Sequence, residues 1–290
     1  MKPSPLDYVR ATSVDHAIEL LASDNDARLL AGGQSLMPVL NLRLGAPELV
    51  VDIGRIDELR SLEFADGDVP ATRGVLRIGA AMTQTEVATH PDVNGRWPML
   101  VAAIAQIGHP QIRNRGTVCG SLAHNDPQAE LPAVAVALGA TMIARSVRGE
   151  RSLSADDMFH GAFTTALEAD EMITAVEFPE PSPEQGWSFR EFSRQPGDFA
   201  TAGVAAVVRR NAGSIESRLV VFGLGGGPTR ATLIEEALLN AAGPDLESSV
   251  IEQWAATLDP VDDAHTSARS KIRHAQRLLV EAVAEAWERM

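Results

Sequence analysis

The sequence predicts an α+β protein. Its 290 residues correspond to about two domains, because one domain usually spans roughly 100–200 residues. Hydrophobic residues make up 45% of the chain and charged residues 22%, a composition that is typical of a protein with a buried core. Strand-like and helix-like runs alternate up to residue 178, and a proline-rich segment separates them from three further strand-like runs.

The first predicted unit, residues 1–57, has the pattern of a βαβ unit. A helix is expected over residues 13–21, because Ser13 can cap it and apolar residues recur on one face. A strand over residues 28–31 follows and ends at a pair of glycines. A short helix and a strand over residues 49–53 complete this unit.

The second predicted unit, residues 58–178, mixes strands and helices. Asp126 and Pro127 are expected to start its most apolar helix, as the N-cap and the first helical residue. A loop rich in Gly, Asn and Arg is expected over residues 108–124. The predicted elements are strands over residues 75–80, 140–145 and 172–178, and helices over residues 84–88, 98–107 and 127–138.

Residues 179–186 contain three prolines and read as a linker to a third unit, residues 187–290. This unit is expected to hold a three-stranded sheet covered by helices. The predicted elements are strands over residues 187–193, 203–209 and 219–224, and helices over residues 233–240, 250–257 and 267–288.

The charge balance excludes some classes of function. The chain has 25 basic and 39 acidic residues, a formal charge of −14, which disfavours binding to nucleic acid. No apolar run approaches the roughly 20 residues that span a bilayer, so no membrane-spanning segment is expected. The N-terminus lacks the apolar stretch of a secretory signal, which predicts a cytoplasmic location.

The chain contains one cysteine, Cys119, which excludes an internal disulfide, a four-cysteine zinc site and an iron–sulfur cluster held by this chain alone. The seven histidines show no metal-binding spacing, so no metal site is expected. Neither a nucleophile motif nor an acid–base pair is visible, so no catalytic residue is expected. This pattern fits a redox cofactor that carries its own chemistry.

Two glycine-containing loops are candidates for binding a dinucleotide. Residues 29–37 form a strand that ends in Gly32 and Gly33, where exposed backbone N–H groups can face a pyrophosphate. Residues 116–132 contain small residues, the hydroxyls of Thr117 and Ser121, and a helix that carries Glu130 near its start. From the residues alone, an ordinary strand–turn–helix corner is favoured for the first loop. The second can also be interpreted as a loop in which Asp126 only caps the following helix.

A third glycine-rich segment, residues 222–228, imitates a dinucleotide-binding fingerprint after a strand. Its sixth position is Pro228, which lacks an N–H group and cannot pack a helix closely against the strand. We interpret this segment as a structural turn.

Three segments, residues 31–38, 107–127 and 191–200, together resemble the FAD-binding (medium) subunits of the molybdenum hydroxylase family, of the carbon monoxide dehydrogenase medium subunit type. The resemblance covers nearly the whole chain. It implies a two-lobed FAD-binding domain of the p-cresol methylhydroxylase type, with lobes over residues 1–57 and 58–178. A separate C-terminal α+β domain over residues 187–290 would follow the linker.

The resemblance also implies a set of FAD-binding residues. The first loop and residues 117–121 would hold the pyrophosphate, residues 123–130 the sugar hydroxyls, and the remaining positions the flavin. The set is Arg28, Leu29, Leu30, Ala31, Gly32, Gly33, Gln34, Ser35, Leu36, Ile107, Gly108, Thr117, Gly120, Ser121, Ala123, His124, Glu130, Met172, Ile173 and Arg190. Two positions depart from the family pattern, because Cys119 replaces a glycine and Ser121 replaces an asparagine.

The resemblance implies an electron-transfer role with non-covalent FAD. Iron–sulfur clusters in a small partner subunit and a molybdenum cofactor in a large one would precede the flavin, in a dimer of heterotrimers. The flavin would pass its electrons to an external acceptor. Any association of the complex with a membrane would come through that acceptor. The alternatives are a stand-alone FAD oxidoreductase and a binding protein without cofactor. The substrate stays open among carbon monoxide, purines, N-heterocycles and aldehydes.

Overall fold

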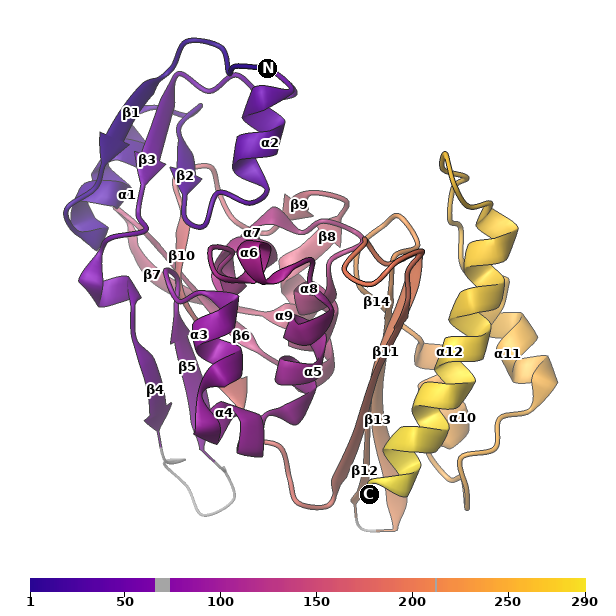
Figure 1. Ribbon diagram of the computed structural model, residues 1–290. Coiled ribbons are helices and arrows are strands. Elements are labelled where there is room, and N and C mark those ends of the chain that lie inside the picture. The colour runs from indigo at the N-terminus through magenta and orange to yellow at the C-terminus, as the bar shows by residue number, and fades with distance from the viewer. Residues whose placement is uncertain (66–73, 212) are drawn as a thin grey trace.

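Three β-sheets with their helices follow one another across the protein in the computed structural model, which describes residues 1–65, 74–211 and 213–290 (Figure 1). The N-terminal sheet lies at one end, and a second sheet with several helices lies below it. The third sheet lies beside the second and carries α12 (Ala268–Glu288) on its outer face. The predicted α+β class is therefore confirmed.

The N-terminal sheet is parallel, with the strand order β1-β3-β2. Its helix α1 begins as expected, because the Ser13 hydroxyl accepts a hydrogen bond from the His16 N–H at 3.1 Å. Strand β1 was not predicted, since most of its residues are exposed and only pairing with β3 orders them. The elements are β1 (Asp7–Arg10), α1 (Val14–Ser23), β2 (Arg28–Leu30), α2 (Leu36–Asn41), β3 (Leu49–Asp52) and η1 (Asp57–Leu59).

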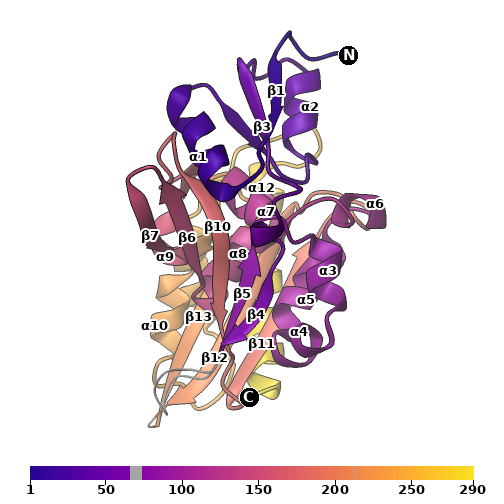
Figure 2. The same cartoon turned by 90° about the vertical axis from the view of Figure 1, so that its left-hand side faces the viewer.

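The second sheet has five antiparallel strands in the order β4-β5-β10-β6-β7, and its helices cover one side (Figure 2). A two-stranded hairpin, β8 and β9, lies outside this sheet. The elements are β4 (Leu62–Ala65), β5 (Val75–Gly79), α3 (Gln84–Thr89), α4 (Pro91–Arg96), α5 (Pro98–Gln106), α6 (Pro110–Arg113), α7 (Val118–His124), α8 (Glu130–Leu138), β6 (Thr141–Ser146), β7 (Gly149–Ser154), α9 (Ala155–Met158), β8 (Phe159–Gly161), β9 (Thr164–Thr165) and β10 (Met172–Pro179).

Two local predictions in this region were wrong. The segment expected as a loop contains α6 and α7, because Pro110 starts one helix and the Thr117 hydroxyl caps the other. Helix α8 begins at Glu130 rather than at Pro127. The Asp126 carboxylate instead accepts a hydrogen bond from the Gln128 N–H at 2.9 Å, which forms a tight turn before the helix.

The third sheet has the three predicted strands and a short fourth one, in the order β11-β12-β13-β14. The glycine-rich segment at residues 222–228 is the turn between β13 and β14, as interpreted from its proline. The elements are β11 (Gln185–Phe192), β12 (Ala202–Asn211), β13 (Ser214–Phe222), β14 (Thr229–Arg230), α10 (Thr232–Leu238), α11 (Ser248–Ala255) and α12.

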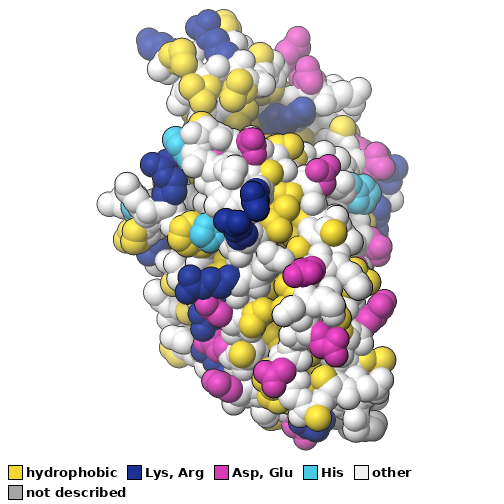
Figure 3. Space-filling model, turned by 90° about the vertical axis from the view of Figure 1, so that its right-hand side faces the viewer, with side chains coloured by type: hydrophobic (Ala, Val, Ile, Leu, Met, Phe, Trp, Pro, Cys, Tyr) yellow, Lys and Arg dark blue, Asp and Glu magenta, His cyan; other side chains and the backbone are white. Residues whose placement is uncertain are grey.

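The third sheet separates two hydrophobic clusters. One face packs on α5 and α8 of the preceding region, and the other face packs on α10 and α12. The first seven residues of β12 and the last four of β13 are buried on both faces, which explains why these stretches are continuously apolar. The surface that carries α11 and α12 shows hydrophobic side chains between acidic and basic ones, so neither charge dominates it (Figure 3).

Candidate functional site

The turn between β2 and α2 presents unpartnered backbone donors. Within the described part of the chain, the N–H groups of Gly32, Gly33, Gln34 and Ser35 donate no hydrogen bond. Gly33 has φ +75°, a left-handed conformation that favours glycine. The hydroxyl of Ser35, at the N-cap position of α2, makes no capping bond. Successive free N–H groups around a left-handed residue form a concave anion site.

The two glycine loops touch through their backbones. A Cβ atom at Gly32 would lie 2.7 Å from the carbonyl carbon of Arg115 and 2.8 Å from the Cα of Gly116. On the same side, a Cβ atom at Gly120 would lie 4.0 Å from that of Ala31. The fold therefore brings together two segments that lie more than 80 positions apart in sequence, as a shared pyrophosphate site requires.

Helix α7 follows this contact and carries four predicted residues, Gly120, Ser121, Ala123 and His124. The N–H of Gly120 donates to the Thr117 hydroxyl at 3.0 Å, so it is not a free donor. The neighbouring thiol of Cys119 is buried, and burial raises its pKa to about 12. A thiol of this kind stays protonated and does not bind metal ions or clusters.

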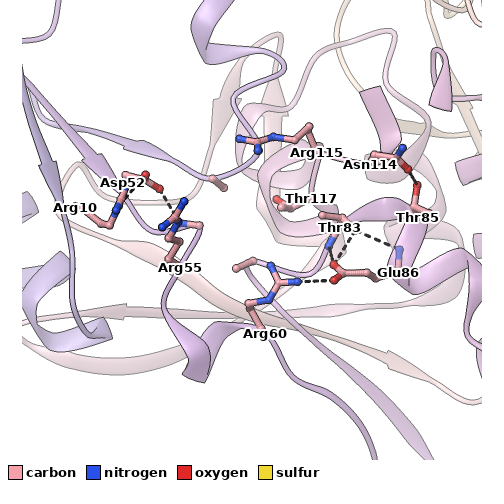
Figure 4. Close-up of a pocket in the computed structure, with 14 residues that line it drawn as sticks. Arg10, Asp52, Arg55, Arg60, Thr83, Thr85, Glu86, Asn114, Arg115 and Thr117 are labelled. Carbon is pink, nitrogen blue, oxygen red and sulfur yellow. Dashed lines mark hydrogen bonds and ion pairs between the residues drawn. The ribbon is translucent and has the colours of Figure 1, made fainter. Parts of the chain in front are cut away.

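A pocket of about 490 Å³ opens next to the contact between the loops (Figure 4). Among the predicted residues it is lined by Ala31, Gly32 and Thr117. Arg10, Arg55, Arg60 and Arg115 also line it, against the carboxylates of Asp52 and Glu86. In a chain with a charge of −14, this excess of positive charge favours a phosphorylated ligand near the loops.

The four arginines of this pocket differ in their pairing. Arg10 lies 3.7 Å from the Asp52 carboxylate, and Arg60 pairs with Glu86. Glu86 also belongs to the capping box of α3, and these contacts hold its pKa low despite partial burial. Within the described residues, the guanidinium groups of Arg55 and Arg115 have no partner. Sequence reasoning missed them because arginines before and after turns are usually solvated.

Ile107 and Gly108, predicted to line the flavin, lie between α5 and α6. Gly108 has φ +45°, and both carbonyls accept hydrogen bonds from the Arg113 guanidinium at 2.7 and 3.0 Å. The C-terminal region contacts this turn, because a Cβ atom at Gly197 would lie 2.7 Å from the Gly108 carbonyl oxygen. The turn predicted to line the flavin therefore contacts the loop between β11 and β12.

His124 and Asn125 contact the hairpin of β8 and β9, and the turn after them contacts the C-terminal region. The His124 ring lies 5.1 Å from that of Phe163, and burial lowers its pKa. The Asn125 amide fixes the hairpin of β8 and β9 by donating to the carbonyls of Gly161 and Thr164. The Gln128 amide donates to the Ala200 carbonyl at 2.9 Å. These contacts fix the C-terminal end of α7 and the turn after it against the β8–β9 hairpin and the loop before β12.

Glu130, the first residue of α8, is 6% exposed. Burial, and then the charge of Glu191, raise the pKa of Glu130 to about 8. Glu191 lies in β11, and burial raises its pKa to about 7. One oxygen of Glu191, Oε2, is buried and has no hydrogen-bond partner among the described residues. A buried carboxyl group without a partner is costly, so this oxygen is suited to a ligand.

Three predicted residues are placed differently from the others. Met172 and Ile173 are 1% and 5% exposed and belong to the hydrophobic core at the start of β10, so they present little surface to a ligand. Arg190 is not brought to the loops. Its guanidinium pairs with Glu281 and Glu285 of α12 at 3.1 and 2.8 Å, on the outer face of the third sheet.

Strand alternation explains why Arg190 points outward and Glu191 inward. Ser188 donates to Glu285 and thus shares the outer face with Arg190. Trp187 and Phe189 pack on the core of the FAD-binding region, and Glu191 follows them on that face. The alternation of apolar and polar residues in β11 was the signal that could have identified Glu191.

Two kinds of feature are absent from the described residues, a metal-binding cluster and a membrane-spanning helix. Residues 1–65, 74–211 and 213–290 contain no group of three His, Cys, Asp or Glu side chains arranged for a metal ion. In the same ranges, no helix combines the length and apolar character needed to cross a membrane.

The fold and the loops define an FAD-binding flavoprotein with a separate C-terminal domain. Residues 4–181 match the family model described as the FAD binding domain in molybdopterin dehydrogenase. Residues 187–286 match the model of the CO dehydrogenase flavoprotein C-terminal domain. The chain belongs to the family of FAD-binding medium subunits of molybdenum hydroxylases.

The sequence similarity to characterised relatives extends over the full length of the chain. The chain is 37% identical to the nicotine 6-hydroxylase medium subunit of Paenarthrobacter nicotinovorans, over 100% of both chains. It is 33% identical to the carbon monoxide dehydrogenase medium chain of Hydrogenophaga pseudoflava, over 100% of this chain and 99% of that one. The solved carbon monoxide dehydrogenase from H. pseudoflava superposes with a TM-score of 0.91 at 34% identity, covering 100% of this chain and 99% of that one.

Proposed function

We propose that this chain takes electrons from iron–sulfur clusters of a partner subunit and passes them, through FAD, to an external acceptor. The observation that carries the proposal is the row of free N–H groups at Gly32 to Ser35, at the point where the two glycine loops touch. Such a row, together with the Ser35 hydroxyl, fits the pyrophosphate of FAD.

We assign the FAD contacts to the residues predicted from the sequence, with Glu191 in place of Arg190. The β2–α2 turn would bind the pyrophosphate. Glu130 and Glu191 would accept hydrogen bonds from hydroxyl groups of the ribose or the ribityl chain. Ile107 and Gly108 would flank the flavin ring. The positive pocket beside Arg115 would add a favourable field for the phosphates.

Bound FAD would supply a centre that exchanges electrons both singly and in pairs. The chain itself supplies binding, orientation and shielding from water. Its only thiol is buried and protonated, so clusters that feed the flavin must lie in another chain. Because the clusters and the flavin lie in different chains, a role as an electron-transfer subunit is favoured over direct oxidation of a substrate by this chain.

We further propose a domain division at residues 1–57, 58–178 and 187–290, with residues 179–186 as the linker. Strands β10 and β11 extend into its two ends and leave residues 180–184 between them. The assembly we propose is a dimer of heterotrimers in the cytoplasm, with one small and one large partner per chain. Relatives whose names specify nicotine, caffeine or carbon monoxide as substrate support a molybdenum hydroxylase of small molecules.

The test is co-expression of a tagged chain with the genes next to its own, followed by measurement of flavin, iron and molybdenum. We expect all three in one complex, with one FAD per chain. Substrate should bleach the flavin absorbance in the complex and leave the isolated, FAD-loaded chain unchanged.

An isolated chain that oxidises a substrate by itself would support the stand-alone oxidoreductase. A chain that retains no FAD at all, alone or in the complex, would overturn the flavoprotein assignment.

A further inference from the structure

We propose that Arg113 is a positioning residue for the flavin. By binding the carbonyl groups of Ile107 and Gly108, its guanidinium turns the N–H groups of Gly108 and His109 toward the cofactor, where they stabilise the negative charge of the reduced ring. The inference rests on the proposed function, because that function assigns Ile107 and Gly108 to the ring. It gives a role to two residues, Arg113 and His109, that neither the sequence motifs nor the comparisons assign.

The turn between α5 and α6 has its carbonyl groups on one side and its N–H groups on the other. Nη1 of Arg113 donates to the carbonyl oxygens of Ile107 and Gly108, at 2.7 and 3.0 Å. In a trans peptide the N–H group points away from the carbonyl of the preceding residue, and the described chain has no cis peptide. The N–H groups of Gly108 and His109 therefore point away from Arg113, and within the described residues they donate no hydrogen bond. Because Gly108 has φ +45°, these successive N–H groups form a concave donor pair.

The C-terminal region closes the carbonyl side of this turn. A Cβ atom at Gly197, in the loop between β11 and β12, would lie 2.7 Å from the Gly108 carbonyl oxygen and 3.1 Å from Nδ1 of His109. Gly197 has φ +80°, so glycine is favoured there for its conformation as well as for this close approach. Since Arg113 and Gly197 occupy the carbonyl side, the N–H side is the face of the turn that is left for a ligand.

Helix α6 connects this turn to the contact between the glycine loops. The carbonyl of Ile112 accepts a hydrogen bond from the Gly116 N–H at 2.7 Å, and the Cα of Gly116 would lie 2.8 Å from a Cβ atom at Gly32. The Ile112 side chain also packs on the turn, because its Cγ1 would lie 3.1 Å from a Cβ atom at Gly108. The four residues of α6 span about 6 Å, a distance that the ribityl chain of FAD can bridge between its pyrophosphate and its ring.

An N–H pair of this kind favours the reduced cofactor over the oxidised one. Reduction of FAD takes up two electrons and one proton, and at pH 8 the product carries one negative charge on the pyrimidine part of its ring, whereas the oxidised ring is neutral. Donors that are already in place bind the charged ring more tightly, because a hydrogen bond to an ionised group is roughly twice as strong as one to a neutral group. Arg113 keeps both peptide groups aligned, so the turn does not reorganise when the charge appears.

The experiment compares the reduction potential of bound FAD at pH 8 in the full-length wild-type chain and in Arg113→Gln. Dithionite supplies the electrons, and a reference dye in the same cuvette reports the potential. The shorter Gln side chain cannot donate to both carbonyls, so we expect reduced FAD to bind about tenfold more weakly, which corresponds to a fall of about 30 mV for a two-electron couple. The dissociation constant of oxidised FAD, measured by flavin fluorescence, should rise less than about threefold.

Three further variants separate positioning from charge and from general destabilisation. Arg113→Lys keeps the charge and a donor, so it should recover at least half of the fall in potential. Gly197→Ala keeps Arg113 but displaces the Gly108 carbonyl, so the potential should fall in the same direction as in Arg113→Gln. Arg269→Gln removes an exposed guanidinium on α12 and is the matched control, which should keep the wild-type potential.

The outcomes are distinct. A potential that is unchanged in Arg113→Gln overturns this inference and leaves the flavoprotein assignment standing. Equal weakening of oxidised and reduced FAD in that variant overturns it as well, because it shows that Arg113 only stabilises the fold. If Arg113→Gln does not fold, Gly197→Ala gives the same decision by the same two criteria. A wild-type chain that binds no FAD contradicts the proposed function, and this inference falls with it.

Discussion

The contact between the two glycine loops can be tested by adding one carbon atom. In Gly32→Ala, the new Cβ would lie 2.7 Å from the Arg115 carbonyl carbon and 2.8 Å from the Gly116 Cα. An ordinary contact needs about 3.4 Å, so the loops must separate by more than about half an ångström. Both neighbours are backbone atoms, which cannot rotate away as a side chain can.

Two consequences follow for Gly32→Ala. Overpacking should lower the free energy of unfolding by about 1–3 kcal/mol. Displacement of the N–H groups of the turn should weaken one charge-assisted hydrogen bond to the pyrophosphate, by about 1.5–3 kcal/mol, which raises the FAD dissociation constant about 10- to 100-fold. Urea unfolding and flavin fluorescence titration measure the two effects separately.

The matched control is Gly45→Ala in the same lobe. Its new Cβ would lie 3.5 Å from the Val39 side chain, an ordinary contact, so both quantities should stay near the wild-type values. Our reasoning is refuted if Gly32→Ala unfolds and binds FAD as the wild type does. Loss of FAD in Gly45→Ala would equally show that the effect is not specific to the loop contact.

Three further predictions use other parts of the structure. The Cys119 thiol, whose pKa burial raises to about 12, should react with a disulfide reagent only as fast as the chain unfolds; rapid labelling of the native chain would contradict its placement. Asp263 has a lowered pKa because Lys271 lies 2.8 Å away and N–H groups donate to it, so it stabilises the fold at neutral pH and loses this effect as the pH falls below about 4. Lys271→Met should therefore flatten the fall in unfolding free energy between pH 5 and pH 3, measured by urea titration; an unchanged slope would exclude the pair as its source. FAD should be released into the supernatant on acid precipitation, because it is expected to be non-covalent; flavin retained in the pellet would show a covalent link.

The sequence by itself determined those features that depend on a few neighbouring residues. Ser13 predicted the start of α1, because a cap needs only its own hydroxyl and an N–H three residues on. The Gly32–Gly33 pair predicted the turn after β2, because the left-handed φ of Gly33 excludes most side chains. The single cysteine placed the clusters outside this chain, because a count does not depend on the fold.

Only the tertiary structure decided which side chains share a surface. Arg190 and Glu191 are neighbours in sequence, yet Arg190 pairs with α12 while Glu191 lies on the opposite face with Trp187 and Phe189, because consecutive strand residues point to opposite faces. The same holds for Gly32 and Arg115, whose backbones touch across the two lobes. Strand β1 also depends on a distant partner, β3, since its own residues are largely exposed. Such contacts depend on how separate elements pack, and no local pattern of residues specifies that packing.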